Sequence, residues 1–134
     1  MADKLSGKAR ALLERPVIAN LATLLPDGSP QLTPLWIDVD GDDLLINTAK
    51  GRAKARNIER DKRVAVSVVD PNDPYNTVVV RGSVVDITTE GADAHIDSLA
   101  KKYLGVDKYP MRQPGEVRIK ARIRTDKITM QSQD

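Results

Sequence analysis

The chain has 134 residues, of which 40% are hydrophobic and 30% charged, with a net charge of +2, and this length favours one domain spanning residues 1–134. The lack of cysteine excludes disulfides, thiolate catalysis and cysteine-based zinc sites, and a single histidine makes a metal site or a Ser-His-Asp triad improbable. With no apolar run of roughly 18 residues and no secretory signal, we expect a cytoplasmic protein with no membrane partner.

The first half of the chain predicts a short helix followed by three strands. Apolar residues recur at helical spacing over 5–14, and Pro16 ends this helix. Proline, glycine and aspartate then mark turns between alternating segments, which predict a three-stranded meander. The predicted strands are 17–25, 31–39 and 43–48.

The second half predicts two more helices among three longer strands. The helices are expected at 52–60 and 92–103, and the strands at 64–69, 77–89 and 116–130. Two prolines place 70–74 in a loop, and Gly82 predicts a bulge or bend. The helices are insertions and not repeated βαβ crossovers. The pattern therefore favours a mainly β fold, a closed antiparallel barrel of six to seven strands.

Positive charge is concentrated between the third strand and the second helix. Seven basic residues lie between Lys50 and Arg63, against only two acidic ones. The Thr48 hydroxyl, the Arg52 fork and the Lys54 point charge converge where the second helix begins, and backbone N–H groups are unpaired there. This segment predicts a phosphate or polyanion site, and a solvated basic helix face is the alternative.

Other polar and aromatic residues receive structural interpretations. Pro34 requires an edge, a bulge or a ligand-facing break in its strand. Trp36 is interpreted as a core residue in preference to a stacking platform. We expect His95 on a helix surface with no role, and residues 101–103 as an ordinary helix end. Four cations alternate along the last strand and predict a solvated face that blocks edge pairing, with a groove for an anionic tail as the alternative: Arg118, Lys120, Arg122 and Arg124.

Two segments carry a resemblance to a known family. They are P-Q-L-T-P-L-W, which begins at Pro30, and L-L-I-N-T-A-K-G-R-A-K-A-R-N-I-E-R-D-K-R-V-A-V-S-V-V-D-P, which begins at Leu44. In this order they resemble the pyridoxamine 5′-phosphate oxidase-like split barrels. More closely, they resemble the B-type deazaflavin-dependent oxidoreductases that use coenzyme F-420. The likeness extends over residues 17–128.

The resemblance implies a split β-barrel and a set of cofactor-binding positions. An aromatic residue from a second subunit would correspond to Tyr75, which implies a homodimer with cofactor sites at its interface. The implied phosphate-binding residues are Thr48, Lys50, Arg52 and Lys54, with Arg56 and Asn57 completing the basic helix. The implied ring-contacting residues are Gln31, Thr33, Pro34 and Leu35.

The implied reaction is hydride transfer from reduced coenzyme F-420 to a small organic acceptor, and the sequence identifies no catalytic residue. The ending Ile128–Asp134 lacks the arginine-rich sequence of true pyridoxamine phosphate oxidases, which argues against vitamin B6 oxidation. The surplus of cations favours the polyglutamate tail of F-420 over FMN, which is the alternative cofactor. A non-catalytic flavin- or deazaflavin-binding protein is a second alternative. The modest net charge and the lack of interleaved aromatics disfavour nucleic acid as a partner.

Overall fold

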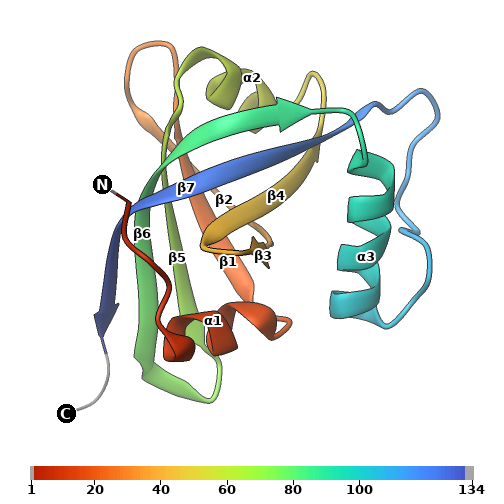
Figure 1. Cartoon of the computed structure of the whole chain (residues 1–134). Helices are drawn as coiled ribbons and strands as arrows, with labels where there is room; N and C mark the ends of the chain where they lie inside the picture. Colours follow the sequence, from red (N-terminus) through yellow and green to blue (C-terminus); the bar gives the residue numbers. More distant parts are fainter. Residues whose placement is uncertain (1, 132–134) are drawn as a thin grey trace.

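The computed structural model describes residues 2–131 as three helices and one curled sheet of seven antiparallel strands (Figure 1). Residue 1 and residues 132–134, the last three of the C-terminal ending considered above, lie outside the described range. The helices are α1 (Gly7–Glu14), α2 (Ala53–Arg60) and α3 (Ala92–Leu104). The strands are β1 (Ile18–Leu24), β2 (Pro30–Trp36), β3 (Asp38–Asp40), β4 (Asp43–Ala49), β5 (Arg63–Asp70), β6 (Asp73–Thr88) and β7 (Arg118–Gln131). The predicted mainly β split barrel is confirmed.

The sheet has the strand order β2-β1-β5-β6-β7-β4-β3, so its two edges are consecutive segments of the chain. Only Ile37 separates β2 from β3. Two predictions were therefore wrong: 31–39 is two strands, and the three-stranded meander does not form, because β2 pairs with β1 while β3 pairs with β4. Turn residues predict hairpins, but they carry no signal for a strand that changes partner midway.

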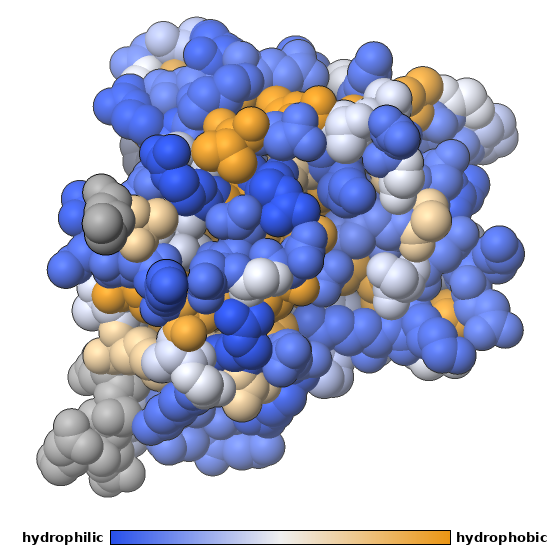
Figure 2. Space-filling model, viewed as in Figure 1, coloured by the Kyte–Doolittle hydropathy of each residue, from blue (hydrophilic) through white to orange (hydrophobic). Residues whose placement is uncertain are grey.

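Alternating aliphatic residues fill the inside of the curled sheet. Val66 and Val68 of β5 and Ile123 of β7 are almost completely buried, and α1 adds Leu12 and Leu13 to the same cluster. Helices α1 and α2 lie at opposite ends of the sheet, and α3 stands beside it (Figure 1). Hydrophilic residues cover most of the face drawn in Figure 2, with small apolar areas between them. Within residues 2–131, no helix is long and apolar enough to cross a membrane.

The β5–β6 connection is tighter than the sequence predicts. The predicted loop at 70–74 is wrong, because β5 extends to Asp70 and β6 begins at Asp73. The Asp70 carboxylate accepts hydrogen bonds from the Asn72 N–H at 2.9 Å and from Asn76 Nδ2 at 3.1 Å, which stabilises a hairpin turn despite two prolines. Tyr75 consequently lies inside β6.

The predicted irregularity at Gly82 is confirmed. The β6–β7 register shifts between Arg81 and Gly82. A Cβ atom at Gly82 would lie 2.6 Å from the Arg124 carbonyl oxygen, so only glycine allows the two strands to approach this closely.

The last residues of α3 form hydrogen bonds with the backbone groups of Ile37, which have no strand partner because the strand breaks there. The Tyr103 hydroxyl accepts from the Ile37 N–H at 3.0 Å and donates to the Val17 carbonyl at 2.6 Å. Lys102 Nζ donates to the carbonyls of Ile37 and Leu13, each at 2.8 Å. The prediction of an ordinary helix end at 101–103 was therefore wrong, because Lys102 and Tyr103 join α3 to the place where the sheet edges meet.

We expect Tyr103→Phe to lower the free energy of unfolding by about 1–3 kcal/mol, because the Ile37 N–H and the Val17 carbonyl lose their hydrogen-bond partner. Urea unfolding of the protein without ligand measures this change. Tyr75→Phe is the matched control, since that side chain is 54% exposed. Equal stability of the two variants would show that the Tyr103 hydroxyl does not stabilise the break.

Candidate functional site

A pocket of about 230 Å³ lies beside α3, where β2, β4, β7 and the beginning of α2 meet. One part of its lining is apolar and another is polar and cationic. The apolar and aromatic lining residues are Leu35, Trp36, Ile96, Leu99, Tyr109 and Met111. The polar and charged ones are Asn47, Thr48, Arg52, Lys54 and Arg118.

Aromatic rings form one wall of this pocket. Trp36 stacks on Tyr103, with ring centroids 5.1 Å apart and planes inclined by 12°, and it meets the edge of Tyr109 at 6.0 Å. The interpretation of Trp36 as a core residue was wrong, because its half-buried ring lines the pocket and lies outside the buried core cluster. A flat ring system could pack against this wall.

Unbalanced positive charge lines the opposite side. Arg52 and Lys54 have no hydrogen-bonded or ion-paired carboxylate among residues 2–131. Burial, together with the nearby positive charges of Arg52 and Arg118, lowers the pKa of Lys54 from 10.5. These groups repel one another, so an oxyanion bound among them would be stabilised.

Two further features of this wall fit an oxyanion. The Thr48 hydroxyl oxygen is buried without a hydrogen-bond partner in the described part of the chain. Arg52 is the N-cap of α2 and makes no side-chain capping bond, so the first-turn N–H groups of the helix remain available. A phosphate or carboxylate group would satisfy both the hydroxyl and the helix terminus.

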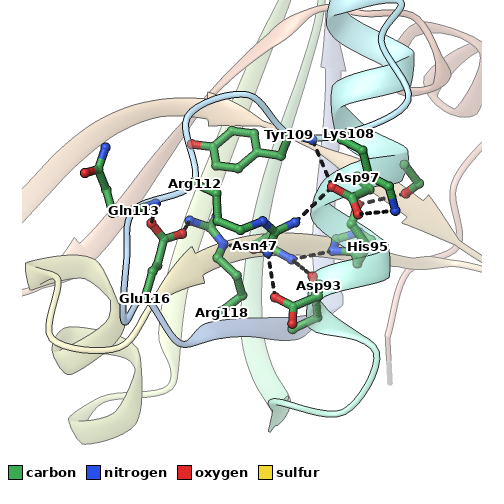
Figure 3. Close-up of polar contacts among 12 residues, drawn as sticks. Asn47, Asp93, His95, Asp97, Lys108, Tyr109, Arg112, Gln113, Glu116 and Arg118 are labelled. Atoms are coloured by element: carbon green, nitrogen blue, oxygen red, sulfur yellow. Dashed lines mark hydrogen bonds and ion pairs between the residues drawn. The ribbon is translucent and has the colours of Figure 1, made fainter.

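Arg118 is held in place by a chain of hydrogen-bonded polar side chains, and most of this chain is buried (Figure 3). Its Nε donates to Asn47 Oδ1 at 2.8 Å, and its Nη1 donates to Glu116. Asn47 Nδ2 also contacts the Ala92 carbonyl at 2.8 Å and His95 Nδ1 at 3.1 Å. His95 Nε2 lies 3.0 Å from Asp38 Oδ2.

The partners of Asn47 determine which group donates and which accepts in each of these hydrogen bonds. Arg118 can only donate and the Ala92 carbonyl can only accept, so the Asn47 amide oxygen must face Arg118 and its NH₂ group must face α3. His95 Nδ1 therefore accepts from Asn47, and His95 Nε2–H donates to Asp38. Burial acts to raise the pKa of Asp38, but the hydrogen bonds from His95 and Val39 outweigh it and lower that pKa below 3.8.

Two sequence predictions were wrong at this point. His95 is buried, with 8% of its surface exposed, and Arg118 is 5% exposed although a solvated face was predicted. The first residue of β7 lies against β4 and α3, so this cation is covered, whereas Arg124 farther along the strand stays exposed as predicted. Strand alternation identifies the face of a residue but not the helix that covers it.

The connection from α3 to β7 carries Tyr109 and Met111 to the pocket and is fixed by α3 carboxylates (Figure 3). Arg112 contacts Asp93 and Asp97, each at 2.9 Å, and the Tyr109 N–H donates to Asp97 at 2.8 Å. The spacing Asp93-x-x-x-Asp97 places both carboxylates on one helix face, which is the sequence signal that could have indicated this attachment.

The structure brings four of the predicted site residues together at the pocket: Leu35, Thr48, Arg52 and Lys54. The other predicted residues lie outside its lining. Asn57 donates to Gln31 Oε1 at 2.9 Å and to Thr23 Oγ1 at 3.0 Å, and Arg56 donates to the Gly51 carbonyl. The remaining four are Thr33 and Pro34 on β2, the exposed Lys50, and Tyr75 on β6. Five lining residues were not predicted from the sequence: Asn47, Ile96, Leu99, Tyr109 and Met111. Arg118 was predicted only as part of the alternative groove for an anionic tail.

Comparison with known proteins gives a consistent result. Residues 5–127 match the family described as "Pyridoxamine 5'-phosphate oxidase". A solved structure named "F420 Reductase" shares 35% identity at a TM-score of 0.80, covering 90% of this chain and 94% of that one. Two others share the fold. A conserved hypothetical protein, Rv2991 from Mycobacterium tuberculosis, has 23% identity, a TM-score of 0.77 and coverage of 98% and 86%. A putative pyridoxamine 5′-phosphate oxidase from Listeria innocua has 17% identity, a TM-score of 0.66 and coverage of 90% and 92%.

The lowered pKa of Lys54 predicts a pH-dependent contribution to stability. Below this pKa the folded protein carries a disfavoured charge, and this penalty disappears as the pH rises to the unfolded value of 10.5. We therefore expect Lys54→Met to gain stability relative to the wild type at neutral pH, and this gain to shrink towards pH 10.5. Urea unfolding of both proteins across that range measures the difference. A difference that does not change with pH would contradict the prediction.

Proposed function

Because this chain belongs to the pyridoxamine 5′-phosphate oxidase family, we propose that it is an oxidoreductase that uses coenzyme F-420 to reduce a small organic acceptor. The family and the relative named "F420 Reductase" support a flavin- or deazaflavin-binding oxidoreductase. The observation that carries the proposal is the pocket itself, in which an aromatic wall faces unpaired cations and an unpartnered buried hydroxyl.

Each side of the pocket would have its own part in binding. Thr48, Arg52 and Lys54 would hold the phosphate by a hydroxyl donor, a planar fork and a point charge. Trp36 and Tyr109 would orient the ring, and Met111 with Leu99 would exclude water from it. The deazaflavin supplies hydride chemistry when bound, so the protein needs no nucleophile of its own.

The number of cations favours F-420 over FMN. Arg52, Lys54 and Arg118 line one pocket, and Glu116, which pairs with Arg118, offsets one of their charges. A phosphate together with glutamate carboxylates carries more negative charge than a single phosphate, so it neutralises more of this positive charge. FMN binding in the same pocket is the alternative.

We expect Arg52→Ala and Lys54→Ala each to weaken F-420 binding by about 1–3 kcal/mol, because each removes a charge-assisted contact. Trp36, the only tryptophan, lines the pocket, so quenching of its fluorescence during titration with F-420 and, separately, FMN reports binding. Lys8→Ala is the control, since Lys8 is an exposed lysine of α1.

Tighter binding of FMN than of F-420 would move the protein to the flavin-dependent branch and leave the pocket assignment intact. Unchanged affinity in both the Arg52 and the Lys54 variants would contradict the assignment. Binding without turnover of any acceptor would favour the cofactor-binding alternative.

We further propose a homodimer formed through the outer face of β2, β1, β5 and β6. This face exposes Ile18, Leu32, Val69 and Val79, one from each of these strands. Tyr75 is 54% exposed and lies on the same side of β6 as Val79, away from the pocket lining of its own chain. A second copy packed here would cover the apolar face and could bring Tyr75 to a cofactor of its partner.

We expect Val79→Lys to convert the dimer into a monomer, because it places a charge on the exposed apolar face that the second copy would cover. Light scattering after size-exclusion chromatography gives the mass. The control is Val106→Lys, since Val106 has a similar exposed fraction, 39% against 41%, but lies in the connection after α3. A monomeric wild type, or a Val79→Lys variant that remains dimeric, would contradict the proposal.

A further inference from the structure

The guanidinium of Arg118 has donor capacity that the protein does not use. An arginine carries five N–H groups, and the contacts of Arg118 within residues 2–131 engage Nε through Asn47 and Nη1 through Glu116. Its Nη2 donates to no protein group in that range. This nitrogen is not among the fully buried polar atoms that lack a partner, and Arg118 lines the pocket, so the free donor is accessible to a ligand bound there.

The free Nη2 donor of Arg118 belongs to the same pocket lining as Arg52 and Lys54. Burial is the largest cause of the lowered pKa of Lys54, and the nearby charges of Arg52 and Arg118 add to it. The Arg118 guanidinium carbon also lies 5.2 Å from the Tyr109 ring centroid, so the planar group lies over the aromatic wall. Three cations therefore line one pocket, and a bound oxyanion would be attracted to all of them.

We propose that Arg118 is a ligand-binding residue that completes, with Arg52 and Lys54, one site for a phosphate or carboxylate oxyanion. We further infer that Asp38, His95 and Asn47 are positioning residues for its guanidinium. The oxyanion site stands on the pocket geometry, and only the identification of its ligand as coenzyme F-420 rests on the proposed function.

The positioning chain distinguishes Arg118 from the other two cations. Arg52 is exposed and Lys54 half-buried, and neither side chain donates to a protein group within residues 2–131. Arg118 is instead held by Asn47, whose orientation is determined by the Ala92 carbonyl and His95. A donor fixed in this way loses little side-chain freedom when a ligand binds.

The first experiment compares Arg118→Gln with Arg124→Gln, which removes the same charge from an exposed position of the same strand. The probes are F-420 and a deazaflavin that lacks both phosphate and glutamate, followed by Trp36 fluorescence. We expect Arg118→Gln to bind F-420 at least about tenfold more weakly, with unchanged affinity for the uncharged probe. Equal F-420 affinity in the two variants would overturn the inference. Arg118→Lys keeps a buried charge near Glu116 and is the variant to use if Arg118→Gln does not fold, with an intermediate loss expected.

Inorganic pyrophosphate and γ-glutamylglutamate are separate probes that need no cofactor. Protection from thermal unfolding by either one, lost in Arg118→Gln and kept in Arg124→Gln, supports the oxyanion site and shows which anion it takes. If the wild type binds neither F-420 nor FMN but this Arg118-dependent protection is present, the proposed function fails while the inference stands. If both variants respond alike to both anions, the inference fails.

The positioning role has its own test at His95. His95→Leu removes the acceptor for Asn47, whereas a glutamine at this position can accept from Asn47 and donate to Asp38. We expect His95→Leu to lose severalfold in F-420 affinity and His95→Gln to recover most of it, with melting temperatures recorded for both. Recovery of stability without recovery of affinity would assign His95 a structural role only and overturn this part of the inference.

Discussion

The arrangement of this protein depends on the break in the sheet at Ile37. Since β2 and β3 are the two edges of one sheet, the buried residue between them cannot use either strand for its backbone hydrogen bonds. Tyr103 and Lys102 supply those bonds from the end of α3. The unpaired backbone groups at this break therefore attach the end of α3 to the place where the two sheet edges meet. The pocket follows from this attachment, because Ile96 and Leu99 of α3 form part of its lining.

The electrostatics of the pocket oppose stability in the protein without ligand. Lys54 is partly removed from water and lies near two other cations, so its charged form is disfavoured, as its lowered pKa indicates. A protein selected for stability alone would place a carboxylate or an apolar residue here. The binding of an anion would relieve the repulsion, which is the expected compromise between stability and function at a binding site.

The sequence predicts the local features of this fold well and its long-range contacts poorly. Helix α2 and the irregularity at Gly82 follow from residue type and spacing alone, and so does the meeting of Thr48, Arg52 and Lys54 at the beginning of a helix. The break at Ile37 and the burial of Arg118 do not, because each depends on a segment distant in the sequence that covers it. The lining contributed by Tyr109 and Met111 was missed for the same reason, since these residues reach the pocket through the attachment of their loop to α3.

Helix α3 connects the break in the sheet with the cationic wall. Its C-terminal end satisfies Ile37, and the side chain of His95, one residue before Ile96, lies between Asp38 and Asn47. Asp38 directly follows Ile37, so the hydrogen-bonded chain that orients Arg118 begins at the same break that α3 closes. A rigid support of this kind is what a site needs when its charges repel one another, because a flexible arginine would turn towards solvent. The helix that satisfies the break between the sheet edges therefore also keeps a cation facing the pocket.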